Sequence, residues 1–128
     1  MDDPALVEDH LARTGLCAVT VTGSSMRPLL RDGDVLLLER AGTPRFGELV
    51  AVLTGSRLIV HRFLGGRGPW LLKADGLSQI DRVEGRLLAR VRVAWRGNRA
   101  LPAVTGWSAA GAAALSLASL PIQRLLRR

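Results

Sequence analysis

Gly23-Ser24-Ser25-Met26-Arg27-Pro28, closed by Asp32-Gly33-Asp34, is the stretch of this chain that decides its fold. Gly23 permits unusual backbone dihedrals, while Pro28 fixes its own φ and biases Arg27 toward extended geometry. A turn with these constraints predicts a rigid platform for a serine hydroxyl, and Ser25 is the candidate. Because Ser/Gly turns before strands are common, the segments around this turn decide whether Ser25 has a chemical role.

Strand-like segments lie on both sides of this turn, separated by Gly, Pro, Asn and Asp residues. They are Cys17 to Thr22, Val35 to Arg40, Glu48 to Leu53, Leu58 to Leu64, Trp70 to Lys73 and Leu87 to Arg96. Short strands at this spacing predict a mainly β fold, built as a compact antiparallel or mixed sheet. In the last strand, alternation predicts a wet face and a core face, the latter formed by Ala89, Val91, Val93 and Trp95.

A short helix is predicted ahead of the strands, from Ala5 to Thr14. Asp3 and Pro4 supply a cap and a first-turn proline, and Gly15 supplies a stop signal. The apolar stripe expected on this helix consists of Leu6, Val7, His10 and Leu11. At 128 residues the chain has room for one core. We expect residues 1–99 to form a catalytic β-domain with its N-terminal helix, and residues 100–128 to form a helical tail.

Two downstream segments carry the side chains that a serine nucleophile needs. A serine hydroxyl is a weak nucleophile until a base lies within hydrogen-bond reach and a donor faces the developing oxyanion. His61 lies on the strand Leu58 to Leu64, and Asp75 and Asp81 follow the strand Trp70 to Lys73. Chain order alone does not define a triad, which is recognised by geometry, so a core histidine is the alternative interpretation of His61.

Three boxes of the chain resemble the type I signal peptidases, in the branch typical of the endoplasmic reticulum and archaea. The matching segments are Ser25-Met26-Arg27-Pro28 for the Ser-Met-x-Pro box, Ile59-Val60-His61-Arg62 for the box where that branch carries histidine, and Lys73-Ala74-Asp75 with Asp81 for the Lys-Gly-Asp box and the aspartate beyond it. Three boxes in this order are a specific signal. The resemblance covers roughly Val19 to Val93 and implies a signal-peptidase-like β-domain, a fold shared with SOS-type and phage repressors.

The resemblance also implies roles for individual residues. Ser25 would be the nucleophile and His61 the general base, with Asp81 as the partner of the imidazole and Asp75 as the second choice. The oxyanion and substrate side of the site would lie around Gly23, Ser24, Met26 and Pro28. Because Gly23 stands where some bacterial members carry a supplementary serine, the backbone N–H of Ser25 would stabilise more of the oxyanion charge, with Ser24 assisting.

Lys73 is the single lysine among 18 basic residues, and it lies in the carboxylate box rather than at the base position. A lysine base must be neutral, which requires burial and a large lowering of its pKa, and a neighbouring Asp75 would oppose this. Histidine, whose unperturbed pKa is ~6.5, needs no such displacement. The sequence therefore favours His61 over Lys73 as the base.

Composition narrows the class of partner. A hydrophobic content of 48% with a charged content of 23% is typical of a globular domain. The net charge of +7 comes from scattered arginines, and with only 4% aromatic residues the chain lacks a stacking platform for nucleic acid. No metal-ligand spacing or phosphate-binding loop occurs in the sequence, so we expect no cofactor or metal. The resemblance to the signal peptidases implies a peptide or protein substrate. The lone Cys17 is predicted to pack in the core.

The C-terminal tail, Ala100 to Arg128, carries no charge between Arg99 and Arg124 and ends in an arginine-rich segment. A bilayer span needs about 20 apolar residues, and the Gly, Ser and Pro content of this tail makes it a weak one. Three alternatives remain: a transmembrane anchor, a helix on an anionic membrane surface, and a helix that covers the β-domain. We expect membrane association through the tail. Because no basic, apolar leader begins the chain, we expect a location in the cytoplasm or on the cytoplasmic side of the membrane.

Three functions fit these features. The first is a serine endopeptidase that cleaves a leader or pro-segment from a peptide or protein. The second is a self-cleaving regulator similar to the repressors, which use a lysine base and carry a DNA-binding domain ahead of the catalytic part. The third is a non-catalytic basic β-module that binds a peptide or a membrane. We expect the first.

Overall fold

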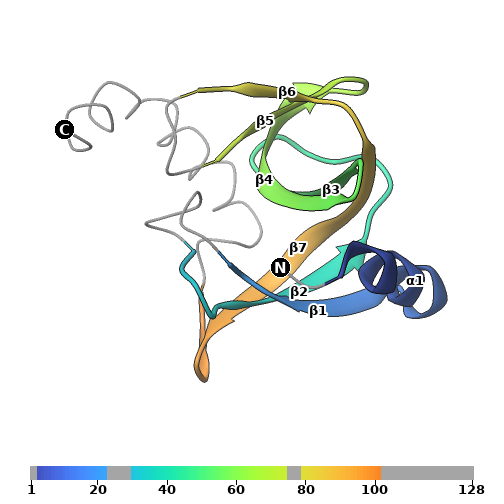
Figure 1. The fold of residues 1–128 in the computed structure, drawn as a ribbon. Coiled ribbons are helices and arrows are strands. Elements are labelled where there is room, and N and C mark those ends of the chain that lie inside the picture. The colour runs from blue at the N-terminus through green and yellow to red at the C-terminus, as the bar shows by residue number, and fades with distance from the viewer. Residues whose placement is uncertain (1–2, 23–29, 75–78, 102–128) are drawn as a thin grey trace, which may run out of the picture.

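The computed structural model describes residues 3–22, 30–74 and 79–101, which form a curled antiparallel sheet with one helix packed on it (Figure 1). The elements are α1 (Pro4–Thr14), β1 (Leu16–Thr20), β2 (Val35–Arg40), β3 (Leu49–Thr54), β4 (Arg57–Gly66), β5 (Trp70–Lys73), β6 (Asp81–Val83), β7 (Arg86–Arg96) and β8 (Arg99–Ala100). The predicted mainly β class with a short N-terminal helix is confirmed. The predicted C-terminal helix falls on residues 102–128, which lie outside the described residues.

The sheet has the strand order β1-β2-β7-β3-β4-β5-β6, and β8 pairs with the end of β7. Strand β7 therefore lies between β2 and β3, although it follows both in the sequence. The two hairpins β3–β4 and β7–β8 turn at Gly55 and Gly97, each with positive φ and followed by a residue with negative φ, as in a type II′ turn. The sequence pattern missed β6 and β8 because strands of three and two residues are too short to show alternation.

Two β-bulges interrupt β7. Leu37 and Leu38 pair with Val93 and Val91, which leaves Arg92 as an extra residue opposite β2. A bulge reverses the alternation of side chains, and Ala94 is fully buried where Val93 was expected to be. The predicted core face of Ala89, Val91, Val93 and Trp95 is therefore wrong in its second half, where Val93 and Trp95 are only half-buried. Leu88 is the second extra residue, opposite β3.

The sheet buries apolar side chains on both faces. The first core lies on one face and under α1, and its members are Val7, Leu11, Val19, Val21, Leu30, Leu36, Leu38, Leu49, Ala51, Val60, Ala74, Ala89, Val91 and Ala94. The second core lies on the opposite face of β3, β4 and β5, and its members are Val50, Val52, Phe63 and Leu72, with Trp70, Val83 and Leu87 packed against them. Because β3 and β4 contribute to both cores, successive residues of these strands meet different environments.

Helix α1 has the predicted ends. The Asp3 side chain accepts a hydrogen bond from the Ala5 amide at 3.0 Å, and Gly15, at φ 79°, ends the helix in the left-handed region. The stripe facing the first core is formed by Val7 and Leu11, whereas Leu6 is 68% exposed and His10 is also exposed, so their assignment to the stripe is wrong. Residues 6 and 10 lie about 100° around the helix from residues 7 and 11. No helix in the described part of the chain is long and apolar enough to cross a membrane.

Candidate functional site

The predicted serine box lies in residues 23–29, outside the described residues. This covers the predictions on Gly23, Ser24, Ser25, Met26 and Pro28. The structure does describe both flanks of the box. The Val21 N–H donates to the Asp34 carbonyl at 2.8 Å, and the Gly33 N–H donates to the Val21 carbonyl at 3.0 Å. These two hydrogen bonds join the chain before the box to the chain after it.

Asp34, the last residue of the Asp32-Gly33-Asp34 turn, anchors this junction to β7. Its carboxylate accepts two hydrogen bonds from the Arg96 guanidinium, from Nε to Oδ1 at 3.0 Å and from Nη2 to Oδ2 at 2.9 Å, and a third from the Arg31 N–H at 2.8 Å. The Asp34 side chain is 2% exposed. The hydrogen bonds from Arg96 lower the pKa of Asp34 although burial opposes this, and the same contact raises the pKa of Arg96.

His61 lies in the middle of β4, where it pairs with Val50 of β3, which in turn pairs with Arg90 of β7. Directly paired residues of antiparallel strands project from the same face, so Arg90, Val50 and His61 form one row across the sheet. This is the face of the second core. The His61 side chain is half-buried, and its Nδ1 atom is fully buried. The predicted base is thus held by a central strand, in a half-buried position with its Nδ1 atom buried.

Glu48 is a carboxylate on the same face that the sequence analysis did not consider. It precedes β3, and its carbonyl accepts a hydrogen bond from the Phe63 N–H at 2.8 Å, so it continues the ladder two positions from the His61 row. Its carboxylate binds the Arg45 N–H at 2.6 Å and lies 3.3 Å from Nη1 of Arg90. Diagonal neighbours on one sheet face lie within reach of long side chains. Alternation within the predicted strand Glu48 to Leu53 puts Glu48 on the face of Val50, but the pairing with β4 that brings this face to His61 is not visible in the sequence.

Arg62 and Lys73 project from the opposite face of the sheet. Arg62 follows His61 on β4 and pairs with both Leu49 of β3 and Lys73 of β5. Both cationic side chains are fully buried. Arg62 Nη1 donates to the Gly47 carbonyl at 2.9 Å, and Lys73 Nζ donates to the Ala74 carbonyl at 3.3 Å. The two candidate bases, His61 and Lys73, are therefore separated by the sheet.

Asp81 begins β6 and pairs with Leu72 of β5, which pairs with Phe63 of β4. This register places Asp81 on the same face as His61, two strands away and level with Phe63 rather than with His61. Its side chain is half-buried. The second carboxylate of the prediction, Asp75, lies outside the described residues. Of the two aspartates, Asp81 is the one whose face the register defines.

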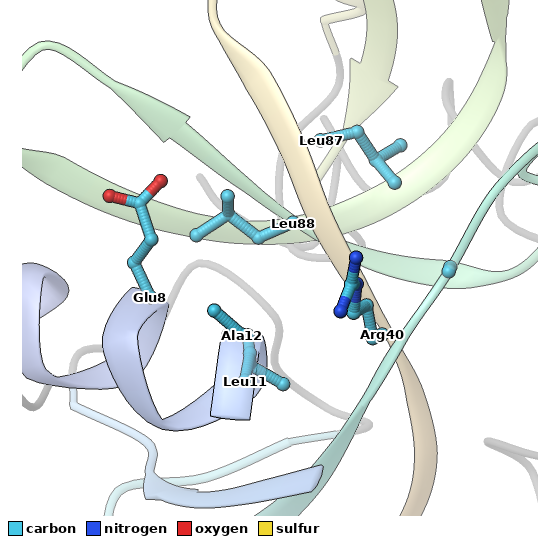
Figure 2. A pocket seen from close by; sticks show the side chains of 7 residues that line it. Glu8, Leu11, Ala12, Arg40, Leu87 and Leu88 are labelled. Atoms are coloured by element: carbon cyan, nitrogen blue, oxygen red, sulfur yellow. The ribbon is translucent and has the colours of Figure 1, made fainter. Parts of the chain in front are cut away.

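A surface cavity of about 210 Å³ lies between α1, β2 and β7 (Figure 2). Its lining residues are Glu8, Leu11, Ala12, Arg40, Ala41, Leu87 and Leu88. None of the predicted site residues lines it. Within residues 3–22, 30–74 and 79–101, no group of three His, Cys, Asp or Glu side chains is arranged to hold a metal ion.

The described residues therefore form a mainly β domain in which hydrogen bonds join the flanks of the serine box beside a sheet that carries His61. The family model described as Peptidase S24-like matches residues 4–81 of the 128, and this chain belongs to that family. The match supports the predicted kinship with signal-peptidase-like serine peptidases, and it spans Ser25, His61 and both aspartates. No curated protein matches the chain.

Proposed function

We propose that this chain is a serine endopeptidase that removes a leader or pro-segment from a peptide or protein, with Ser25 as nucleophile and His61 as general base. The observation that supports this most strongly is the family match over residues 4–81, which includes the serine box and the histidine strand. The resemblance to the histidine-bearing branch of the signal peptidases assigns the base to His61. The position of His61 on the sheet is compatible with that role.

The environments of His61 and Lys73 favour the imidazole as the base. A general base must reach the nucleophile and later pass its proton to the leaving amine, so its ring has to face the substrate. His61 is half-buried on β4, whereas Lys73 is fully buried on the opposite face, beside Arg62. The sheet separates Lys73 Nζ from His61, so a substrate bound on the His61 face would be within reach of the imidazole and not of Lys73.

The proposed reaction proceeds in two steps. As the Ser25 hydroxyl attacks the scissile carbonyl, His61 takes its proton, and the imidazolium then gives that proton to the leaving amine to form an acyl-enzyme. Water next attacks the ester, with His61 again accepting and returning the proton. The backbone N–H of Ser25, assisted by Ser24, would stabilise the oxyanion, and Gly23, Met26 and Pro28 would shape the substrate side.

Asp81 is proposed to orient the imidazole and to stabilise its charged form during each step. It shares the sheet face of His61 through the pairs Asp81–Leu72 and Leu72–Phe63. Asp75 remains the alternative for this role. Neither assignment requires a metal or cofactor, because the proton moves between side chains and substrate.

The experiment that tests the proposal is covalent labelling of Ser25 with a serine-directed fluorophosphonate, followed by mapping of the adduct by mass spectrometry. We expect labelling at Ser25 in the wild-type protein and none in Ser25→Ala, because the reagent reacts with activated serines. Labelling that is equal in the two proteins, or absent from folded wild-type protein, would contradict the proposal. The second of these outcomes would favour a non-catalytic peptide- or membrane-binding module.

Self-cleavage is the second function that the family match is compatible with. Incubation of the purified protein at alkaline pH, followed by intact-mass measurement, distinguishes it from cleavage of a separate substrate. Two fragments that form at a rate independent of protein concentration would indicate self-cleavage. We expect the intact mass to persist.

We further propose a location in the cytoplasm or on the cytoplasmic side of a membrane, with the tail from residue 100 to residue 128 making the membrane contact. The support is the uncharged, alanine- and leucine-rich segment flanked by arginines. Cell fractionation of the full chain and of a chain ending at Leu101 tests this. Recovery of both in the same fraction would argue against a membrane role for the tail.

A further inference from the structure

We propose that the Asp34–Arg96 ion pair is a positioning element for the serine nucleophile, which sets the reactivity of Ser25 by tying the base of its loop to β7. This inference rests on the proposed function. It is carried by contacts among described residues on both sides of the serine box, and it assigns a role to two residues outside the three boxes.

The two flanks of the serine box meet at one junction. Val21 precedes the box, and its backbone exchanges hydrogen bonds with Gly33 and Asp34, which follow the box, at 3.0 and 2.8 Å. Val21 is 6% exposed and Leu30 is 1% exposed, and both belong to the first core. The chain therefore leaves the sheet and returns to it at one well-packed junction. The backbone that enters the serine box and the backbone that leaves it are thus held at the same junction.

An ion pair between Asp34 and Arg96 holds this junction against β7. Both carboxylate oxygens of Asp34 are engaged by Arg96, in a bidentate contact that fixes distance and direction together. Oδ2 also accepts the Arg31 N–H, so the same carboxylate fixes the turn that ends the loop. The Asp34 side chain is 2% exposed, whereas the Arg96 side chain is 37% exposed, so the carboxylate is the buried partner of this ion pair.

Strand β7 carries residues that connect to both the serine box and His61. Arg96 ends β7, while Arg90, six positions earlier on the same strand, pairs with Val50, the partner of His61. Figure 1 shows β7 as a single long strand crossing the middle of the sheet. Strand β7 thus contacts Asp34 through Arg96 at its end, and it lies in the row of His61 through Arg90. The ion pair is the side-chain link between the loop and this strand.

Loss of this ion pair is expected to change the rate at which Ser25 reacts. A displacement of about 1 Å between a nucleophile and its base can reduce a rate by about 100-fold without unfolding the protein. Loss of the ion pair should therefore slow the attack by Ser25 in molecules that remain folded. A purely structural ion pair would instead lower the folded fraction and leave the reactivity of the folded molecules unchanged.

The test measures the second-order rate of fluorophosphonate labelling at Ser25 in the full chain, at neutral pH and a temperature at which circular dichroism shows every variant to be folded. The variants are Asp34→Asn, Arg96→Gln, Arg96→Lys and the double variant Asp34→Asn/Arg96→Gln. Arg86→Gln is the matched control, because it removes an ion pair between β7 and Glu8 of α1 that does not touch the loop.

We expect Asp34→Asn and Arg96→Gln to label about 10- to 100-fold more slowly than wild type, and the double variant to match the slower single variant. Arg96→Lys should recover part of the rate lost in Arg96→Gln, and the control should stay within about twofold of wild type. Hydrogen exchange at the amides of Val21, Arg31 and Gly33 should accelerate in the slow variants, while the amides of β3 and β4 keep their protection.

Wild-type labelling rates in Asp34→Asn and Arg96→Gln would overturn the inference while leaving the proposed function intact. Independent effects that multiply in the double variant would also overturn it, because the two residues would then not act as a pair. Failure of Ser25 to react in wild-type protein would overturn the proposed function first.

Discussion

His61 and Arg62 are neighbours on β4, yet they meet opposite environments. His61 is half-buried in a row with Val50 and Arg90, whereas Arg62 is fully buried on the other face, in a row with Leu49 and Lys73. The period of two along a strand produces this difference. His61 and Lys73, the two candidate bases, are therefore not interchangeable, because Lys73 pairs with Arg62 and lies on the other side of the sheet.

The largest expected effect is a loss of activity on replacement of His61, compared with replacement of Lys73. His61→Ala should reduce kcat/KM for a cleaved peptide by about 100- to 10,000-fold, since general-base catalysis contributes in that range. Lys73→Met, which keeps the volume of a buried side chain, should stay within about tenfold of wild type once folded. Steady-state kinetics on both variants check this. Retained activity in His61→Ala with loss in Lys73→Met would move the proposal to a serine–lysine pair.

The next effect tests the buried face through stability. Arg62→Ala should lower the free energy of unfolding by about 3 to 5 kcal/mol, because it removes a fully buried side chain and the donor to the Gly47 carbonyl. Arg57→Ala, at the exposed start of the same strand, is the control and should change it by less than about 0.5 kcal/mol. Urea denaturation measures both. Equal stability of the two variants would contradict the described packing of Arg62.

A smaller loss of activity is expected when a carboxylate on the His61 face is replaced. Asp81→Asn should reduce kcat by about 10- to 100-fold, since a hydrogen bond to a charged group contributes about 1.5 to 3 kcal/mol and the amide cannot neutralise an imidazolium. Glu48→Gln is the companion variant, since Glu48 lies on the same face next to the His61 row. A larger loss of kcat there than in Asp81→Asn would assign the orienting carboxylate to Glu48.

The smallest effect is a pH-dependent change in the free energy of unfolding on replacement of Asp34. The pKa of Asp34 is lowered in the folded protein by Arg96, so this group stabilises the fold above its unfolded pKa of about 3.9, and that stabilisation disappears as pH falls through the lower folded value. Wild type should exceed Asp34→Asn by about 2 kcal/mol at neutral pH. The gap should narrow below about pH 4. Urea titrations at several pH values check this, and a gap that widens toward acid would contradict the sign.

Prediction from the sequence succeeded where local signals were strong. The ends of α1 follow from the Asp3 cap, Pro4 and Gly15, and six of the strands follow from alternating segments bounded by turn residues. It failed where a neighbouring strand changed the local pattern. The bulge at Arg92 exists because of the register of β2 against β7, so no alternation within β7 could have shown that Ala94 replaces Val93 in the core.

The candidate site likewise has residues that the sequence predicted and contacts that only the structure shows. The serine box, the histidine box and the carboxylates were predicted from residue types and their order, and their individual roles stay predictions, while the family match supports the family. The contacts of Asp34 with Arg96, which are 62 positions apart, and the approach of Glu48 to the His61 row were not predictable. The first depends on the pairing of β7 with β2 and the second on the pairing of β3 with β4, both of which belong to the arrangement of the whole sheet.

By itself, the sequence determined the class of the domain, the helix with its caps, and the residue types that a serine peptidase needs, because these depend on short-range periodicity and on turn chemistry. Only the tertiary structure decided that His61 and Asp81 share a face, that Lys73 lies behind the sheet, and that Arg96 holds the turn after the serine box. The physical reason is that strand register and β-bulges are set by pairing between distant segments, and one residue of shift reverses the face to which a side chain points.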